Sequence, residues 1–182
     1  MKKIIITVFA ATSLLLYSTQ AFALLNFSVG VPLSHTFTGK WSDGTAIESD
    51  GVGGYFIQIG VPMLPGLGMD SHKVQIKNDS NIPHYVSTTM YNLYYILPIP
   101  IINLTLGVGT GKSQFEILGL KGDDGTATQW YTSLGIPILP LFDLHLSYRS
   151  ISSKIESTSG NDKGKKDDVG GNVMGLGIGF NF

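Results

Sequence analysis

Apolar residues recur at every second position in several segments of the chain, and this alternation restricts the fold more than any other feature of the sequence. A period of two is the period of a β-strand whose two faces differ. In 173–182 every second residue, from Met174 to Phe182, is large and apolar, while the positions between are mostly glycine. The segments 54–61, 102–109 and 142–149 alternate in the same way. We therefore predict eight strands, at 25–38, 52–62, 68–78, 84–97, 101–116, 126–137, 141–155 and 171–182.

The connections between these strands are of two kinds, which alternate along the chain. Three are short, apolar and rich in proline, at 60–65, 97–100 and 135–140. The other four are polar and mostly longer, at 39–51, 79–83, 117–125 and 156–170. Successive connections of an up-and-down barrel lie at opposite ends. The prediction is an all-β fold, an eight-stranded antiparallel up-and-down β-barrel with both termini at its short-turn end.

The low charge of the chain fits a secreted or envelope β protein, and the Gly, Ser, Thr and Asn that dominate the polar strand faces suit the narrow filled lumen of a membrane barrel. Charged residues make up 14% of the sequence, against about 25% in typical soluble proteins. The apolar run 94–102 contains Pro98 and Pro100, so it is not a spanning helix. A closed barrel, by contrast, satisfies all of its backbone groups in lipid. Alternation alone does not say which face is inside, and a soluble lipocalin-like carrier is the alternative.

Aromatic residues gather toward the ends of the predicted strands. Such residues form girdles at the two interfaces of membrane barrels. The predicted girdles are Phe37, Tyr55, Tyr85, Trp130 and Tyr148 near the polar connections, and Phe27, Tyr95, Phe142 and Phe180 near the short turns.

The N-terminus has the pattern of a secretory leader. A basic start at Lys2 and Lys3 precedes an apolar run over 4–17, and Ala21 and Ala23 form the small-residue pattern that signal peptidase reads. We predict a cleaved signal peptide at 1–23 and a barrel domain at 24–182, exported to the outer membrane.

The leader, the eight strands, the short and long connections and the terminal aromatic strand together resemble the small outer-membrane barrels of Gram-negative bacteria, namely the OmpA membrane domain, OmpX and Ail, and the opacity-type proteins. The resemblance is architectural and covers 24–182. In that superfamily the barrel assembly machinery recognises the terminal aromatic strand. The resemblance therefore implies an assembly signal at Phe182, Phe180 and Ile178.

Pro32 falls inside the first predicted strand. A proline cannot donate a ladder hydrogen bond, and a closed barrel has no free edge to place it on. The prediction is a β-bulge at Pro32, with a later start of the strand as the alternative.

Polar residues that alternate through 143–149 are predicted to point into the lumen. Charges in a barrel interior are normally paired, because an isolated buried charge is costly. The predicted lumenal polar network consists of Lys73, Gln75, Lys77, Glu116, Asp143, His145 and Arg149. A serine hydrolase site built from Asp143, His145 and Ser147, acting on outer-leaflet lipid, is the alternative for part of this set.

Other site chemistries find little support in the sequence. The chain has no cysteine and a net charge of −1, so thiolate sites and a nucleic-acid footprint are excluded. The glycine-rich segment 107–113 lacks the first glycine of a phosphate-binding loop, since position 106 is leucine. No metal and no cofactor is expected. Asp123 and Asp124 are interpreted as part of a turn, with a cation site as the alternative. Trp41 is interpreted as either a partner anchor or a rim-packing residue.

The predicted function is that of a non-enzymatic outer-membrane barrel with a structural or surface-interaction role. Its expected partners are lipopolysaccharide and other outer-membrane lipids, the assembly machinery during biogenesis, and a host or surface ligand that contacts the loops, where Lys163, Lys165 and Lys166 lie. A narrow conduit for small molecules is the main alternative. An outer-leaflet lipid-modifying enzyme and a soluble carrier are the others.

Overall fold

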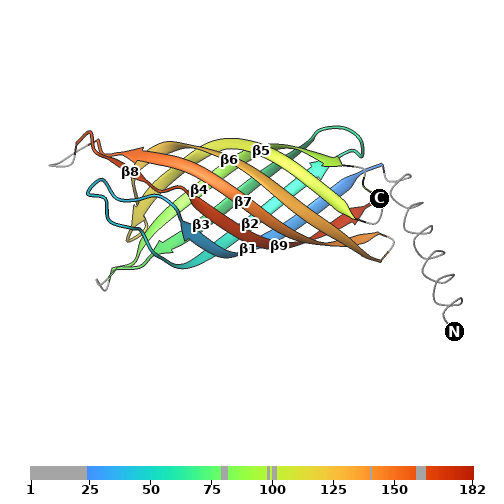
Figure 1. Ribbon diagram of the computed structural model, residues 1–182, viewed down its shortest axis with the longest axis horizontal. Coiled ribbons are helices and arrows are strands. Elements are labelled where there is room, and N and C mark those ends of the chain that lie inside the picture. Colours follow the sequence, from blue (N-terminus) through green and yellow to red (C-terminus); the bar gives the residue numbers. More distant parts are fainter. Residues whose placement is uncertain (1–23, 79–81, 98, 100–101, 140, 159–162) are drawn as a thin grey trace, which may run out of the picture.

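The computed structural model is a closed β-barrel (Figure 1). It describes residues 24–78, 82–97, 99, 102–139, 141–158 and 163–182, so the predicted signal peptide at 1–23 lies outside the described residues. The predicted all-β, eight-stranded antiparallel barrel is confirmed. Its wall consists of β1 (Asn26–Phe37), β2 (Ser49–Gly60), β3 (Gly66–Ile76), β4 (His84–Leu97), β5 (Asn103–Ile117), β6 (Leu120–Leu139), β7 (Phe142–Glu156) and β9 (Gly171–Asn181). A short additional strand, β8 (Lys166–Asp168), pairs with the end of β7 inside the last polar connection.

Each wall strand pairs with its neighbour along the chain, and β9 closes the barrel by pairing with both β7 and β1. The β1–β9 ladder runs from Asn26–Asn181 to Phe37–Gly171. The N–H of Leu25 donates to the carbonyl of Phe182 at 3.0 Å, so the first and last described segments lie side by side at the short-turn end. Among the residues that the structure describes, no helix is long and apolar enough to cross a membrane.

The first short turn lies within the predicted connection 60–65, but the strands on either side of it begin and end earlier than predicted. β2 ends at Gly60 and β3 begins at Gly66, so both strands are shifted by about two residues toward the N-terminus. In the turn the N–H of Leu64 donates to the carbonyl of Val61 at 3.1 Å, and Met63 has a φ of 66°. Pro62 has no N–H to donate to a ladder, and the strand therefore stops before it.

The predicted bulge at Pro32 is confirmed. The register of β1 against β9 shifts between Pro32 and Ser34. On the other side of β1, the described ladder with β2 ends at the Gly30–Phe56 pair. Pro32 therefore lies just beyond the last β1–β2 pair, where a missing N–H breaks no ladder bond with β2.

The lower part of the barrel, toward the short turns, is apolar outside and polar inside. On β7 the outward side chains up to Tyr148 are Phe142, Leu144 and Leu146, all of which are exposed. The inward side chains of the same segment are Asp143, His145, Ser147 and Arg149, all of which are buried. This is the arrangement that lipid contact requires.

The upper part of the barrel, toward the polar connections, has the reverse arrangement. Above Tyr148 the outward residues of β7 are polar, as at Ser152 and Lys154, and Ile151 and Ile155 point inward and are buried. Apolar side chains from several strands and connections fill the interior here, as in a water-soluble protein. This upper apolar cluster consists of Phe37, Ile47, Val74, Ile76, Val86, Ile155 and Val169.

Two groups of outward aromatic rings border the apolar belt. In the lower group Phe180 packs against Phe142, Phe27 and Phe182 at centroid distances of 5.1–6.3 Å. In the upper group Trp130 lies 5.7 Å from Tyr148. The prediction that Phe37 belongs to a girdle is wrong, because its ring is buried in the upper apolar cluster.

The third polar connection is a strand hairpin. β5 and β6 remain paired up to Ile117–Leu120, and only Leu118 and Gly119 form the turn. The expected turn at Asp123 and Asp124 is therefore wrong, since both lie within β6. Above the lipid belt the outward face of a strand is polar, so its sequence looks like that of a loop.

Candidate functional site

A buried ion pair spans the middle of the lumen. Nε of Arg149 on β7 donates to Oδ2 of Asp70 on β3 at 3.0 Å, and the two side chains are 3% and 0% exposed. The guanidinium also lies 3.6 Å from the ring centre of Phe56 and donates to Ser147 Oγ at 2.6 Å. A charge in this position is costly unless it is paired. The Asp70–Arg149 pair therefore joins opposite walls of the barrel.

Polar side chains from other strands extend this pair across the lumen. Nε2 of Gln129 donates to Asp70 Oδ2 at 2.6 Å and to Asn92 Oδ1 at 2.5 Å. Gln58 donates to the Tyr131 hydroxyl at 2.7 Å, and the Tyr131 side chain is 1% exposed. The sequence analysis missed Asp70, Gln129, Asn92, Gln58 and Tyr131, although the alternation of their strands places all of them at inward positions.

A second polar group lies nearer the short turns. Asp143 Oδ2 accepts hydrogen bonds from the side-chain amides of Asn103 at 2.5 Å and Asn181 at 2.8 Å, and Asn26 donates to Asn181 at 2.7 Å. All of these side chains are buried. Asp143 therefore has amide partners, whereas Arg149 is paired with Asp70.

The row of Asp143, His145 and Ser147 does not form a catalytic relay in this geometry. Nε2 of His145 is 4.0 Å from Asp143 Oδ2, beyond hydrogen-bond range. The hydroxyl next to the imidazole is that of Ser133, 3.3 Å from His145 Nδ1, and Ser147 is bonded to Arg149 instead. Within the described parts of the chain no group of three or more His, Cys, Asp or Glu residues is placed to hold a metal ion.

Four residues that were assigned to the lumen lie on the outer face of the upper barrel instead. Lys73, Gln75 and Lys77 alternate with inward Val74 and Ile76 on β3 and its continuation, and Glu116 alternates with Phe115 on β5. Lys73 Nζ pairs with Glu116 Oε1 at 2.5 Å. Gln75 donates to Asp50 at the start of β2, and Lys77 pairs with Glu48 just before that strand. The lumenal assignment of these four is corrected: above the lipid belt polar residues face outward, because water surrounds the wall there.

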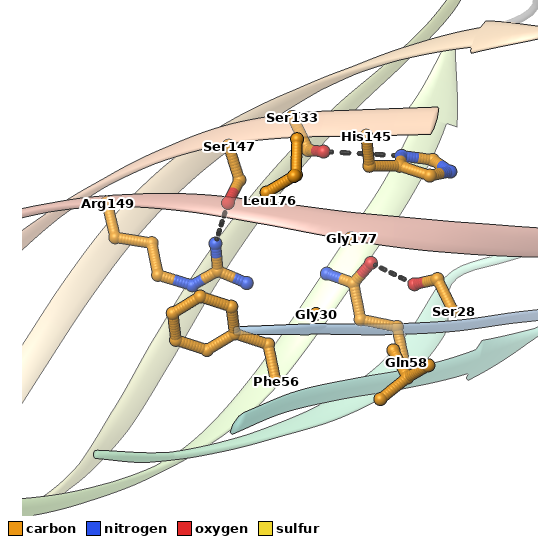
Figure 2. Close-up of a pocket in the computed structure, with 11 residues that line it drawn as sticks. Ser28, Gly30, Phe56, Gln58, Ser133, His145, Ser147, Arg149, Leu176 and Gly177 are labelled. Atoms are coloured by element: carbon orange, nitrogen blue, oxygen red, sulfur yellow. Dashed lines mark hydrogen bonds between the residues drawn. The ribbon is translucent and has the colours of Figure 1, made fainter. Parts of the chain in front are cut away.

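A small cavity lies beside Arg149 (Figure 2). Its volume open to water is about 20 Å³, room for about one water molecule. Phe56 stacks on Arg149 along one side, Ser28 donates to Gln58 on another, and Ser133 and His145 complete it (Figure 2). A cavity of this size has room for a single water molecule and is too small for a substrate.

Glycines on the inward face make room for the large lumenal side chains. A Cβ on Gly107 would collide with the ring of Tyr131, and one on Gly179 would collide with the imidazole of His145. The segment 107–113, which resembles a phosphate-binding loop in composition, is part of β5. Its first glycine therefore serves close packing inside the barrel.

Substitution of Gly107 by valine should destabilise the barrel by about 1–3 kcal/mol through overpacking against Tyr131. The matched change Gly53→Val adds a side chain where no atom lies within 4 Å of the new Cβ, and it should be close to neutral. Urea unfolding of the two variants in detergent micelles measures the difference. Equal effects would show that the lumen around Tyr131 can accommodate a larger side chain at position 107 without strain.

The first polar connection is ordered by contacts with the rest of the upper barrel. The ring of Trp41 stacks on Phe115 at 5.8 Å, which identifies Trp41 as a rim-packing residue. Ser42 N–H donates to Asp167 at 2.8 Å. Hydrogen bonds from the hydroxyl and the N–H of Thr45 lower the pKa of Asp43 below its usual value.

Comparison with known proteins identifies the fold. No protein-family model matches the sequence, and no curated protein matches it. The crystal structure of Neisserial surface protein A superposes with a TM-score of 0.62 at 12% identity, over 87% of this chain and 97% of that one. OprG of Pseudomonas aeruginosa gives a TM-score of 0.48 at 14% identity over 90% and 98%, and Ail of Yersinia pestis gives 0.44 at 16% over 87% and 97%. The closed ladder, the apolar outer belt and the likeness to Neisserial surface protein A show that the chain has the eight-stranded fold of small outer-membrane β-barrels.

Proposed function

We propose that the protein is a sealed outer-membrane barrel whose function is exerted at its polar, extracellular end. The lower barrel has an apolar outer face between two groups of aromatic rings, which suits lipid on all sides. The N-terminal leader predicted from the sequence supports export. The polar connections then face the outside of the cell, and the short turns face the periplasm.

The observation that carries this proposal is that side chains occupy the lumen at both levels. The Asp70–Arg149 network crosses its middle, and the upper apolar cluster fills it above. Eight strands leave an interior just wide enough for side chains. A structural or surface-contact role needs no passage through the barrel, and it fits this interior better than transport does.

Single-channel recording in planar bilayers tests the sealed barrel. Folded protein, verified by its heat-dependent shift in gel mobility, should give no conductance steps. A porin added to the same bilayer serves as the positive control for insertion. Stepwise conductance from the folded protein would contradict the proposal.

A narrow conduit for small molecules is the second candidate. The small cavity beside Phe56 and Arg149 and the glycine-rich inner face of β9 favour it. The cavity has room for about one water, so transport would require the Arg149–Asp70 network to rearrange. This makes a conduit the weaker candidate.

The terminal strand is proposed as the signal for the barrel assembly machinery. Ile178, Phe180 and Phe182 lie on the outward face of β9 and its end, and the ring of Phe180 stacks parallel to that of Phe182 at 6.3 Å. Ile178 and Phe182 are exposed on this face, beside the seam where β9 pairs with β1.

Lipopolysaccharide and a surface ligand are the proposed partners of the upper barrel, and the proposed role is non-enzymatic. Lysines on its outer face, such as Lys112 and Lys166, have exposed side chains even though each pairs with a carboxylate. Catalysis on outer-leaflet lipid would need an accessible His145, whereas that imidazole is buried among Ser133 and Asp143.

A further inference from the structure

The turn between β5 and β6 carries exposed aliphatic side chains at the outer end of the barrel. Ile117, Leu118 and Leu120 are 44%, 68% and 75% exposed. Ile82, 42% exposed, precedes His84, and His84 is the cross-strand partner of Ile117. We call these four residues the apolar tip. Nothing in the water-exposed upper barrel requires apolar side chains at this position.

The backbone of the apolar tip is one that leucine rarely adopts. Leu118 has a φ of 54°, and Gly119 follows with a φ of 77°. Asparagine or glycine fits a left-handed two-residue hairpin turn with much less strain. A leucine in this strained backbone conformation, with its side chain exposed, points to a use for that side chain.

The apolar tip is held in place by contacts on the strands that carry it. Below it, the Trp41 ring stacks on Phe115, and Glu116 pairs with Lys73 and accepts from Ser87 at 3.0 Å. On β6, Asp123 accepts a hydrogen bond from Thr158 of the last polar connection. A rigid support reduces the entropy that binding would cost.

The tip lies too far from the lipid belt of its own barrel to enter the same membrane. Leu120 is ten residues above Trp130 along β6. At a rise of ~3.3 Å per residue and a tilt near 40°, this separation is roughly 25 Å along the barrel axis. Whatever covers the tip must therefore approach the barrel from outside.

Size, shape and charge together select a lipid surface as the occupant. The four side chains expose a few hundred Å², less than the roughly 800 Å² that each partner buries in a standard protein interface. A two-residue turn is convex, so it penetrates a soft lipid interface more readily than it covers a flat protein surface. Glu116 lies opposite Lys121 and Lys112 pairs with Asp124, so the flanks offer no excess positive charge for anionic headgroups.

We propose that the apolar tip inserts into the interface of a lipid bilayer apposed to the outer end of the barrel, and that burial of Leu118 and Leu120 drives this contact. The inference rests on the proposed surface-contact function and names the surface contacted. Because the contact is apolar, zwitterionic lipid is sufficient, and added salt does not weaken it.

Flotation of protein-loaded nanodiscs with phosphatidylcholine vesicles tests the proposal. The wild type should float with the vesicles, whereas Leu118→Asn combined with Leu120→Thr should lower binding by about tenfold or more. Asparagine suits the left-handed turn and threonine suits the strand, so the hairpin is retained. The matched control is Met63→Asn at the opposite end, where Met63 has a φ of 66° and is 70% exposed, and it should leave binding unchanged.

Three results would overturn the proposal: no flotation of the wild type beyond that of empty nanodiscs, equal binding by the tip variant, or an equal loss in Met63→Asn. A steep fall of binding with salt would likewise overturn it in favour of headgroup electrostatics. Capture of a protein partner by the tip without vesicle binding would replace lipid by protein. A negative flotation result would not contradict the sealed barrel. Conductance steps in planar bilayers would contradict the sealed barrel, but they would not bear on lipid binding by the apolar tip.

Discussion

Replacement of Asp70 by alanine should lower the free energy of unfolding by about 3–5 kcal/mol, because it leaves the buried Arg149 guanidinium without its counter-charge. Asp70 is 0% exposed and Arg149 lies among Phe56, Tyr131 and Ser147, so bulk water does not solvate the guanidinium in place of the carboxylate. Urea unfolding in lipid vesicles, followed by tryptophan fluorescence and by heat-dependent gel mobility, measures the loss.

Two further variants separate the buried charge from the loss of side-chain volume. Asp124→Ala removes the carboxylate of the exposed pair with Lys112, and it should cost about 0–1 kcal/mol. The double variant Asp70→Leu, Arg149→Met removes both buried charges and should be more stable than Asp70→Ala alone. If Asp70→Ala is no worse than Asp124→Ala, the network does not stabilise the barrel.

Leu146→Arg should destabilise the barrel by about 2–4 kcal/mol, the cost of a cation facing the middle of a bilayer. Leu146 is 47% exposed on the outward face of β7, pairs with Leu176 on β9, and lies between the two aromatic groups, four residues from Phe142 and two from Tyr148. Reversible unfolding in vesicles, with the wild type in parallel, gives the difference.

The matched change Ser152→Arg places the same cation on the same face of β7, six residues higher. There the outer face is polar, and the effect should be about 0–1 kcal/mol. A soluble carrier makes a different prediction: arginine would be harmless at both positions, since both face water. Equal and small effects would therefore contradict the membrane barrel.

The strands and their order followed from the sequence because alternation is a local property of each segment. The period of two located all eight wall strands, and the two kinds of connection indicated their up-and-down order, although β6 begins six residues earlier than predicted. Pro32 was recognisable as a bulge because no central strand accommodates a proline otherwise.

The prediction that polar side chains point into the lumen was correct for Asp143, His145 and Arg149. It was wrong for the residues on β3, its continuation and β5. Alternation separates the two faces of a strand but does not say which of them is polar at a given height. On β3 the same parity carries Asp70 below and Val74 above, both inward. Only the depth of a residue relative to the lipid belt decides whether a polar side chain points in or out.

By itself, the sequence determined the strand pattern, the alternation of connections and the apolar belt, since each depends on residues close together in the chain. The tertiary structure decided which polar groups meet, because Asp70 and Arg149 are 79 residues apart and join only when the barrel closes. It also decided where the polarity of the two faces reverses. That reversal follows from the medium outside the wall, lipid below the Trp130–Tyr148 pair and water above it.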